Sequence, residues 1–187
     1  MERDVLITFI SGGARSGKSN FSEHTALSFY NKAQENKRNS SLYYIATAKK
    51  SDEEMAERIR IHQKQRINAW KTVEESFDLV PFLSDCQKGD VILIDCLTIW
   101  LSNVMFERNY RIDRIETAVN SWLRLAREHQ FHLLIVSNDI NEDIPSSDQV
   151  ALTYMHCLQR LHQIIVQQSE LVVQVQAGIP TYWKGVK

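Results

Sequence analysis

The chain has 187 residues, of which 43% are hydrophobic and 24% are charged, and its net charge is −1. These values are those of a globular protein with a substantial core, and the length predicts a single domain over residues 1–187. The near-neutral charge argues against general binding to nucleic acid or to a membrane surface, because such partners require an excess of basic residues.

The cysteines and apolar segments predict a cytoplasmic protein. Cys86, Cys96 and Cys157 are odd in number and widely spaced, so they fit neither a disulfide framework nor a zinc motif. The short apolar stretch near the start is typical of a strand rather than of a signal peptide. No apolar run approaches the roughly 20 residues of a membrane helix.

A predicted strand at residues 5–10 and a predicted helix at 21–30 enclose the most informative stretch of the chain. Residues 12–19 between them match G-x-x-x-x-G-K-[ST], the phosphate-binding loop (P-loop) of nucleotide-binding proteins. A chance match in a turn is the alternative. The order of strand, loop and helix favours the functional interpretation.

Each residue type in this loop has a physical reason. Gly12 and Gly17 allow turns and a close backbone approach that a Cβ atom would block. The free amides and the positive dipole end of the following helix favour an anion. Lys18 can reach the β- and γ-phosphates, and the Ser19 hydroxyl can ligate Mg²⁺, which prefers hard oxygen ligands.

The next segments predict a loop, a strand and a helix. Residues 31–41 are polar and predict a loop, and residues 42–47 predict the second strand. Ser51 and Glu54 then form a capping box, which predicts the start of another helix.

His62 lies on one face of this predicted helix, together with Met55, Ile59 and Arg66. A histidine in such a position is most often a packing residue, but this one has basic neighbours: Arg58, Arg60, Lys64 and Arg66. Nearby cations suit an anionic substrate and keep an imidazole neutral and nucleophilic. His62 is therefore a candidate nucleophile, with a solvated basic helix face as the alternative.

Asp95 ends the third predicted strand, residues 91–95. Before it, residues 67–75 predict a connecting stretch and residues 77–83 a helix. A carboxylate at the end of a parallel strand can hold Mg²⁺ opposite a phosphate-binding loop. The alternative role is to cap the next helix.

The rest of the chain continues the alternation of helices and strands. Helices are predicted at residues 97–106, 112–126 and 150–168, strands at 132–136 and 171–176, and a polar loop at 138–148, with a break at 178–180. Strands separated by helix-length connections predict a mainly parallel sheet flanked by helices, an α/β fold.

At these motifs the sequence closely resembles the adenosylcobinamide kinase/adenosylcobinamide-phosphate guanylyltransferase family of cobalamin biosynthesis. The family's G-G-A-R-S-G-K-S loop stands unchanged at residues 12–19, and its Y-I-A-T strand motif at 44–47. A longer family motif matches residues 53–74, around His62, and D-C-L-T-x-W-L-S-N matches 95–103.

The resemblance implies a RecA-type P-loop fold in three layers, a homotrimer and a bifunctional enzyme. With ATP or GTP and Mg²⁺, such an enzyme phosphorylates adenosylcobinamide. It then transfers GMP from GTP to the product through a guanylylated histidine, here His62. Lys18 and Asp95 would complete the catalytic set, and Ser19 with Asp95 would hold the metal. The nucleotide site implied by this matching comprises Gly12, Gly13, Ala14, Arg15, Ser16, Gly17, Lys18, Ser19, Ile45, Ala46, Thr47, Gln63, Lys64, Gln65, Arg66, Glu74 and Asp95.

Residues 138–145 depart from the family pattern. Two glycines of N-E-V-G-x-G-x-V-P are replaced, and acidic residues stand at Glu142 and Asp143. Two alternatives therefore remain: a related kinase or nucleotidyltransferase with another acceptor or a single step, and a nucleotide-binding protein without turnover.

Overall fold

The computed structural model describes residues 7–36, 39–49, 69–139 and 148–185. These residues form one sheet of seven strands in the order β3-β2-β4-β5-β1-β6-β7. The strands are β1 (Ile7–Gly12), β2 (Leu42–Ala46), β3 (Trp70–Glu74), β4 (Val91–Asp95), β5 (His132–Asn138), β6 (Leu171–Gln176) and β7 (Ile179–Lys184). All neighbouring strands are parallel except β6 and β7, which pair antiparallel.

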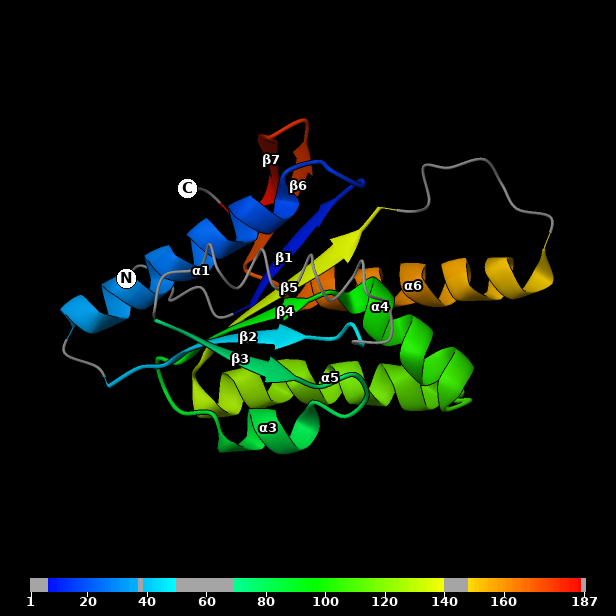
Figure 1. Ribbon diagram of the computed structural model, residues 1–187, viewed down its shortest axis with the longest axis horizontal. Coiled ribbons are helices and arrows are strands. Elements are labelled where there is room, and N and C mark those ends of the chain that lie inside the picture. Colours follow the sequence, from blue (N-terminus) through cyan, green and yellow to red (C-terminus); the bar gives the residue numbers. More distant parts are fainter. Residues whose placement is uncertain (1–6, 37–38, 50–68, 140–147, 186–187) are drawn as a thin grey trace.

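Helices cover both faces of the sheet (Figure 1). They are α1 (Lys18–Glu35), α3 (Val80–Asp85), α4 (Leu97–Ser102), the π-helical turn η1 (Asn103–Glu107), α5 (Ile112–His129) and α6 (Gln149–Gln168). Helix α1 packs on one face, and α3, α4, α5 and α6 pack on the other. The three layers follow from apolar strands that need cover on both sides.

Alternate side chains of each central strand enter two separate cores. In β4, Ile92 and Ile94 contact the core under α5 and α6, whereas Val91 and Leu93 face the core under α1. The predicted stripe of α5 is buried at Ile115, Val119, Trp122, Leu123 and Ala126. The continuous apolar run of β4 is thus explained by burial on both faces.

Two edge strands were not expected from the sequence. The stretch predicted as a connection contains β3, which pairs with β2, and the break at residues 178–180 is a turn that leads into β7. Both strands lie at sheet edges, where polar residues and Pro180 are tolerated because one side needs no ladder hydrogen bonds.

One loop prediction and two helix predictions also need comment. The loop predicted at residues 31–41 is wrong for its first part, because α1 continues to Glu35 and buries Ala33. The helix predicted at 77–83 is α3, which begins three residues later and ends two residues later than predicted. The helix predicted from Ser51 lies outside the described residues.

The strand register aligns the C-terminal ends of three neighbouring strands. Ile10, Val136 and Asp95 lie side by side on β1, β5 and β4. The loops after these strands therefore open on the same edge, which is where ligands bind in open α/β sheets.

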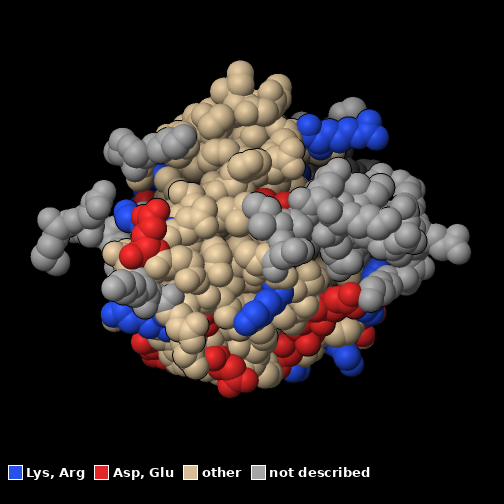
Figure 2. Space-filling model, turned by 60° about the vertical axis from the view of Figure 1, so that its left-hand side comes forward, with Lys and Arg blue, Asp and Glu red and all other residues tan. Residues whose placement is uncertain are grey.

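The surface carries both signs of charge. On the face shown in Figure 2, acidic and basic side chains alternate around a largely uncharged centre. Among the helices that the structure describes, none combines the length and apolar content needed to cross a bilayer.

Candidate active site

The P-loop lies between β1 and α1 and is shaped by its backbone. A Cβ atom on Gly12 would lie 2.4 Å from the carbonyl oxygen of Val175 and 2.6 Å from Oγ of Ser16, so only glycine fits there. Gly17 has φ of 90° and Arg15 has φ of 56°, both in the left-handed region. The loop thus turns sharply before α1 begins at Lys18. The first amides of α1 have no partner within the helix, so they are suited to binding an anion.

Lys18 folds back over the loop. Its Nζ donates a hydrogen bond of 2.9 Å to the carbonyl oxygen of Gly13, and the residue as a whole is only 8% exposed. The ammonium group therefore stands over the backbone where phosphate oxygens would be cradled. Ser19, the next residue, is half-buried in the first turn of α1.

The turn between β6 and β7 supports the P-loop from outside. The amide of Gly178 donates to the carbonyl oxygen of Ser16 at 2.8 Å. A Cβ atom on Gly17 would lie 3.3 Å from Cα of Gly178, so the two backbones are in close contact. The last strand pair of the chain thus fixes the shape of its first loop.

Asp95 lies at the same sheet edge, two strands from the P-loop. Because β5 lies between β4 and β1, the strands that carry Asp95 and the P-loop are about 10 Å apart. The hydroxyl of Tyr44 donates to Oδ2 of Asp95 at 2.5 Å, which fixes the orientation of the carboxylate. The peptide bond between Asp95 and Cys96 is cis.

Thr47 joins the ends of β2 and β4 through its side chain. Its Oγ1 accepts from the amide of Cys96 at 2.8 Å and donates to the carbonyl oxygen of Cys96 at 2.9 Å. The side-chain amide of Asn103 donates to the carbonyl oxygen of Thr47. Thr47 is fully buried, so its hydroxyl holds the two strand ends together.

Cys96 is not a thiolate nucleophile. Burial and, after it, the charge of Asp95 raise the pKa of its thiol to about 11. The thiol therefore stays protonated near neutral pH and contacts Oγ1 of Thr98.

The structure brings together some of the site residues expected from the sequence. The P-loop, residues 45–47 and Asp95 lie at one sheet edge, and Glu74 ends β3 beside Ala46. Ile45 and Ala46 are buried as whole residues, and β2 is paired with strands on both sides. The expected residues His62, Gln63, Lys64, Gln65 and Arg66 lie outside the described part of the chain.

A polar cluster behind the P-loop was missed by the sequence analysis. Oδ2 of Asp139 accepts hydrogen bonds from Oγ of Ser11 and Nε2 of Gln174, at 3.2 and 3.0 Å. The amide of Asp139 donates to the carbonyl oxygen of Gly12. The carboxylate therefore ties β5, β1 and β6 together directly before the P-loop. Its position after a strand was the available signal, but its partners are more than 30 residues away in the sequence.

His162 belongs to the same region, on α6. Its Nε2 is 2.7 Å from Oγ of the fully buried Ser137, and its ring packs on Phe9. Burial lowers the pKa of His162 to about 4, although the nearby Asp139 acts in the opposite direction. The imidazole is therefore neutral at physiological pH.

The donor set fits a magnesium ion bound together with phosphates. Within the described ranges, no three His, Cys, Asp or Glu side chains gather to form a metal cage. Mg²⁺ usually takes one or two protein oxygens and completes its shell with water and substrate phosphates. Ser19 and Asp95, at the same sheet edge, are of the type and number that this mode requires.

Comparison with known proteins gives a consistent family match. The family model "Cobinamide kinase / cobinamide phosphate guanyltransferase" matches residues 8–182. The "Bifunctional adenosylcobalamin biosynthesis protein CobP" of Pseudomonas aeruginosa is 33% identical over 185 residues, which cover 98% of each chain. The corresponding protein CobU of Escherichia coli is 26% identical, over 93% of this chain and 97% of its own length.

A solved structure supports the fold independently. A KaiC-like protein from the archaeon Pyrococcus horikoshii superimposes with a TM-score of 0.52 at 13% identity. The match covers 97% of this chain and 80% of that one, and it confirms the expected RecA-type P-loop fold. The family model spans both the P-loop and Asp95, and with the relative from Pseudomonas aeruginosa it shows that the chain belongs to the cobinamide kinase/cobinamide phosphate guanyltransferase family.

Proposed function

We propose that the chain is a bifunctional enzyme that phosphorylates adenosylcobinamide and then attaches GMP to the phosphate. The observation that carries the proposal is a complete P-loop, with Lys18 over its backbone, in a chain that matches this family from residue 8 to 182. The relatives from Pseudomonas aeruginosa and Escherichia coli are named as bifunctional proteins of adenosylcobalamin biosynthesis.

In the kinase step, a hydroxyl of the corrinoid attacks the γ-phosphorus of ATP or GTP, and the nucleoside diphosphate leaves. The P-loop amides and Lys18 neutralise the charge that develops on the transferred group. Ser19 and Asp95 would hold Mg²⁺, which would supply positive charge to neutralise the phosphates. Tyr44, which donates to Asp95, keeps that carboxylate in place.

In the transferase step, His62 attacks the α-phosphorus of GTP, and pyrophosphate leaves. The phosphate of the corrinoid then attacks the same phosphorus, GMP is transferred and the imidazole is released. Two displacements replace one difficult reaction, which is the advantage of covalent catalysis. The basic neighbours of His62 in the sequence suit the anionic donor. Gln63, Lys64, Gln65 and Arg66 are proposed to contact the nucleotide.

A single-step enzyme or one with another acceptor is the second candidate, because residues 138–145 differ from the family pattern. The departures, which are the two replaced glycines and the acidic Glu142 and Asp143, lie outside the described residues. We propose a single domain that forms a trimer, with no nucleic-acid or membrane partner.

The deciding experiment incubates the full chain with α-labelled GTP and Mg²⁺, followed by denaturation and peptide mapping. We expect an acid-labile GMP adduct on His62 that is absent in His62→Ala and present in the matched control His156→Ala. His156 is exposed on α6 and has no role in the proposal. An adduct that persists in His62→Ala would exclude His62 as the nucleophile.

The acceptor is tested separately by adding adenosylcobinamide and unlabelled ATP or GTP. Formation of adenosylcobinamide phosphate supports the kinase half. A GMP adduct without phosphorylation of this corrinoid would favour the second candidate.

A further inference from the structure

Asn138 ends β5, the strand that lies between the P-loop strand and the strand that carries Asp95. It pairs in register with Gly12 of β1, whereas Asp95 pairs with Val136, two residues earlier on β5. Adjacent strands are about 4.8 Å apart. The backbone of Asn138 therefore lies directly beside the start of the P-loop and extends beyond the level of Asp95.

The alternation of side chains places Asn138 on the face of the sheet that α1 covers. Val136, two residues before it, enters the core under α1. By the same alternation, Asp95 shares this face with Leu93, which agrees with its bond from Tyr44 of the same core. Because α1 begins on this face at the end of the P-loop, Asn138 and Asp95 are on the same side of the sheet as the loop.

A hydrogen bond to α4 orients the side chain of Asn138, which is half-buried. Its Nδ2 donates to Oγ1 of Thr98 at 3.1 Å. Thr98 is itself buried and held in place: its Oγ1 is 2.9 Å from Sγ of Cys96, and its carbonyl oxygen accepts from the hydroxyl of Tyr154 at 2.7 Å. A side-chain amide has two N–H hydrogens, so the second one is available to a ligand after the bond to Thr98.

The backbone of Asn138 is held from the other side by the next residue. The amide of Asp139 donates to the carbonyl oxygen of Gly12 at 3.1 Å, and its carboxylate accepts from Ser11 and Gln174. These bonds fix the end of β5 against β1. The amide group of Asn138 is thus positioned before any ligand binds, which is what a precise contact requires.

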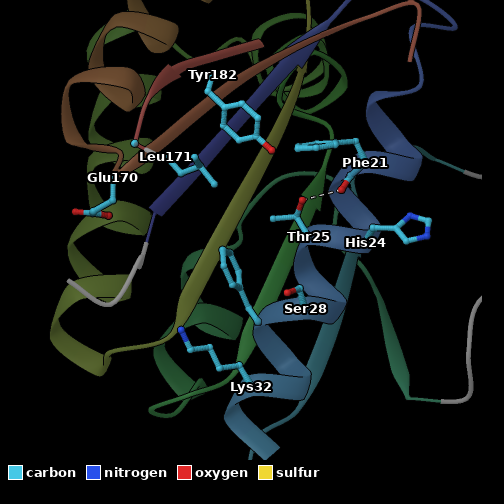
Figure 3. Close-up of a pocket in the computed structure, with 10 residues that line it drawn as sticks. Phe21, His24, Thr25, Ser28, Lys32, Glu170, Leu171 and Tyr182 are labelled. Carbon is cyan, nitrogen blue, oxygen red and sulfur yellow. Dashed lines mark hydrogen bonds between the residues drawn. The ribbon is translucent and has the colours of Figure 1, made fainter. Parts of the chain in front are cut away.

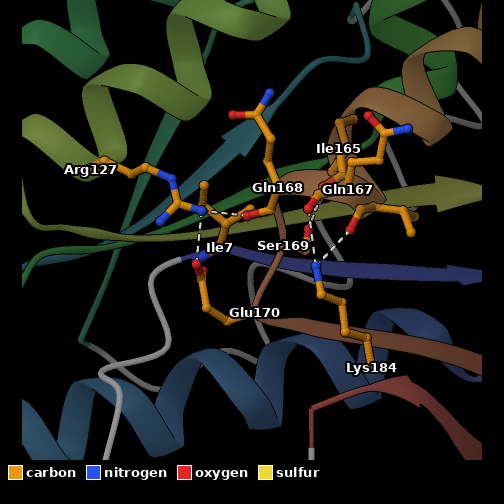
Figure 4. Close-up of polar contacts among 9 residues, drawn as sticks. Ile7, Arg127, Ile165, Gln167, Gln168, Ser169, Glu170 and Lys184 are labelled. Carbon is orange, nitrogen blue, oxygen red and sulfur yellow. Dashed lines mark hydrogen bonds and ion pairs between the residues drawn. The ribbon is translucent and has the colours of Figure 1, made fainter.

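At the opposite end of the strands, charged side chains are bound by other parts of the chain. Arg127 pairs with Glu170 at 2.8 Å, and Glu170 accepts from the amide of Ile7 at 2.9 Å (Figure 4). Lys184 donates to two carbonyl oxygens near the end of α6. A cavity of about 530 Å³ lies between α1 and β6–β7 (Figure 3), and residues 12–19 are not part of its wall. Neither feature includes the P-loop, so phosphates bound there meet the side chains beside the loop, among them Asn138.

The position of Lys18 indicates which phosphate lies nearest to Asn138. The lysine of a P-loop reaches the β- and γ-phosphates. Nζ of Lys18 stands at the carbonyl oxygen of Gly13, one residue after the pairing partner of Asn138. Asp95, the candidate metal ligand, lies on the other side of β5. Asn138 therefore lies between two groups that act on the terminal phosphates of a nucleotide.

We propose that Asn138 contacts the terminal phosphate of a bound nucleoside triphosphate and distinguishes it from a diphosphate. One N–H of its side-chain amide stays on Thr98, and the other donates to an oxygen of the γ-phosphate. This bond orients the γ-phosphate and is lost once that group has been transferred, so the diphosphate is held less tightly than the triphosphate. The inference rests on the proposed use of a nucleoside triphosphate at the P-loop.

The test compares two matched nucleotides, α,β-methylene GTP and α,β-methylene GDP, which differ only in the γ-phosphate. Their binding to the full chain with Mg²⁺ is measured by isothermal titration. The methylene group prevents transfer of GMP, and no acceptor is added, so binding is measured without turnover. Asn138→Ala should weaken binding of the triphosphate roughly tenfold and change binding of the diphosphate less than about twofold, because only the triphosphate loses a charge-assisted hydrogen bond.

Two further variants and a control sharpen this comparison. Asn138→Asp keeps the shape but places a negative charge beside the phosphate, so it should weaken binding of the triphosphate more than Asn138→Ala does. Thr98→Val removes the acceptor that orients Asn138 and should weaken the triphosphate about threefold. The matched control Asn31→Ala, at an exposed position of α1, should bind both nucleotides as the unmodified chain does.

Failure of this inference and failure of the proposed function give different results. If Asn138→Ala, folded by circular dichroism, weakens both nucleotides equally or neither of them, the inference is overturned while nucleotide use at the P-loop stands. The same criterion applies to Asn138→Asp if the alanine variant does not fold. If the unmodified chain binds neither nucleotide, or Lys18→Ala binds both normally, the proposed function is contradicted, and the inference with it.

Discussion

The two sides of β5 support the candidate active site by different means. On the β1 side, the P-loop is held by backbone contacts: Gly12 against Val175, and the amide of Gly178 on Ser16. On the β4 side, the strand ends are held by side chains, with Thr47 on Cys96 and Tyr44 on Asp95. The first region therefore cannot accept an added carbon at Gly12, whereas the second depends on individual hydroxyl groups.

The largest expected effect comes from Lys18, the one cation of the P-loop that folds back over its backbone. Lys18→Ala should reduce nucleotide affinity and both activities roughly a hundredfold or more, because the charge on the phosphates loses its closest partner. Isothermal titration with GTP and assays of each step measure this. Lys88→Ala, at an exposed position far along the chain, is the matched control and should behave as the unmodified protein. Normal turnover in Lys18→Ala would contradict the placement of the phosphates.

Gly12 and Gly13 provide a second test of the P-loop side, which is held by backbone contacts. Gly12→Ala places a methyl group 2.4 Å from a backbone oxygen and should lower the free energy of unfolding by roughly 3 kcal/mol. Gly13→Ala is the matched comparison, because no atom lies within 4 Å of the added carbon. Denaturant unfolding of both variants gives the difference. Equal stability of the two would mean that the loop is not held as described.

His162 contacts Ser137 of β5, the strand between the two sides, and its contribution to stability is tested by changing the pH. The pKa of folded His162, about 4, is below its ordinary value of 6.5, so the unfolded chain binds a proton that the folded chain does not. Stability conferred by neutral His162 is complete above about pH 6.5 and is lost as the pH falls towards 4. The loss should reach roughly 2 kcal/mol.

His162→Gln is the control for this prediction, since carboxylates also titrate in the acid range. The difference in unfolding free energy between the two proteins should change from pH 7 to pH 4.5. A constant difference would show that His162 is as easily protonated in the folded state as in the unfolded state.

The smallest expected effect concerns the ends of β2 and β4, which are held together by side chains. Thr47→Val removes the hydroxyl that bonds twice to Cys96 and should destabilise the fold by roughly 1–2 kcal/mol. Thr47→Ser keeps the hydroxyl and should lose clearly less. Thermal or denaturant unfolding of this pair separates the hydrogen bonds from the change in shape. If serine does not restore stability, packing rather than hydrogen bonding joins β2 and β4.

The same contrast explains what the sequence could predict. The P-loop is a local motif, so strand, loop and helix were predicted from residues 5–30. The parallel sheet followed from apolar runs such as 91–95, which need cover on both faces. The strands β3 and β7 were missed because they are edge strands, with residues such as Lys71 and Pro180 that are uncommon in central strands.

Contacts between distant side chains could not be predicted. Asp139 meets Ser11 across 128 positions and Gln174 across 35, and no local pattern records these pairings. The orientation of Thr47 was missed for the same reason. A nucleotide-contacting role was expected for it, but its hydroxyl is bonded to Cys96 inside the protein. Its amide donates to the carbonyl oxygen of Asp95 and its own carbonyl oxygen accepts from Asn103, so the main-chain atoms of Thr47 are paired inside the protein as well.

The bond from Gly178 to Ser16 has a consequence for biosynthesis. The ribosome synthesises the phosphate loop long before it reaches the strands β6 and β7 that brace this loop. A nascent chain therefore holds the motif before it holds the strands that shape it. The bond to Ser16 can form only after Gly178 has been added, and a chain truncated before β7 would keep the motif but lack this contact.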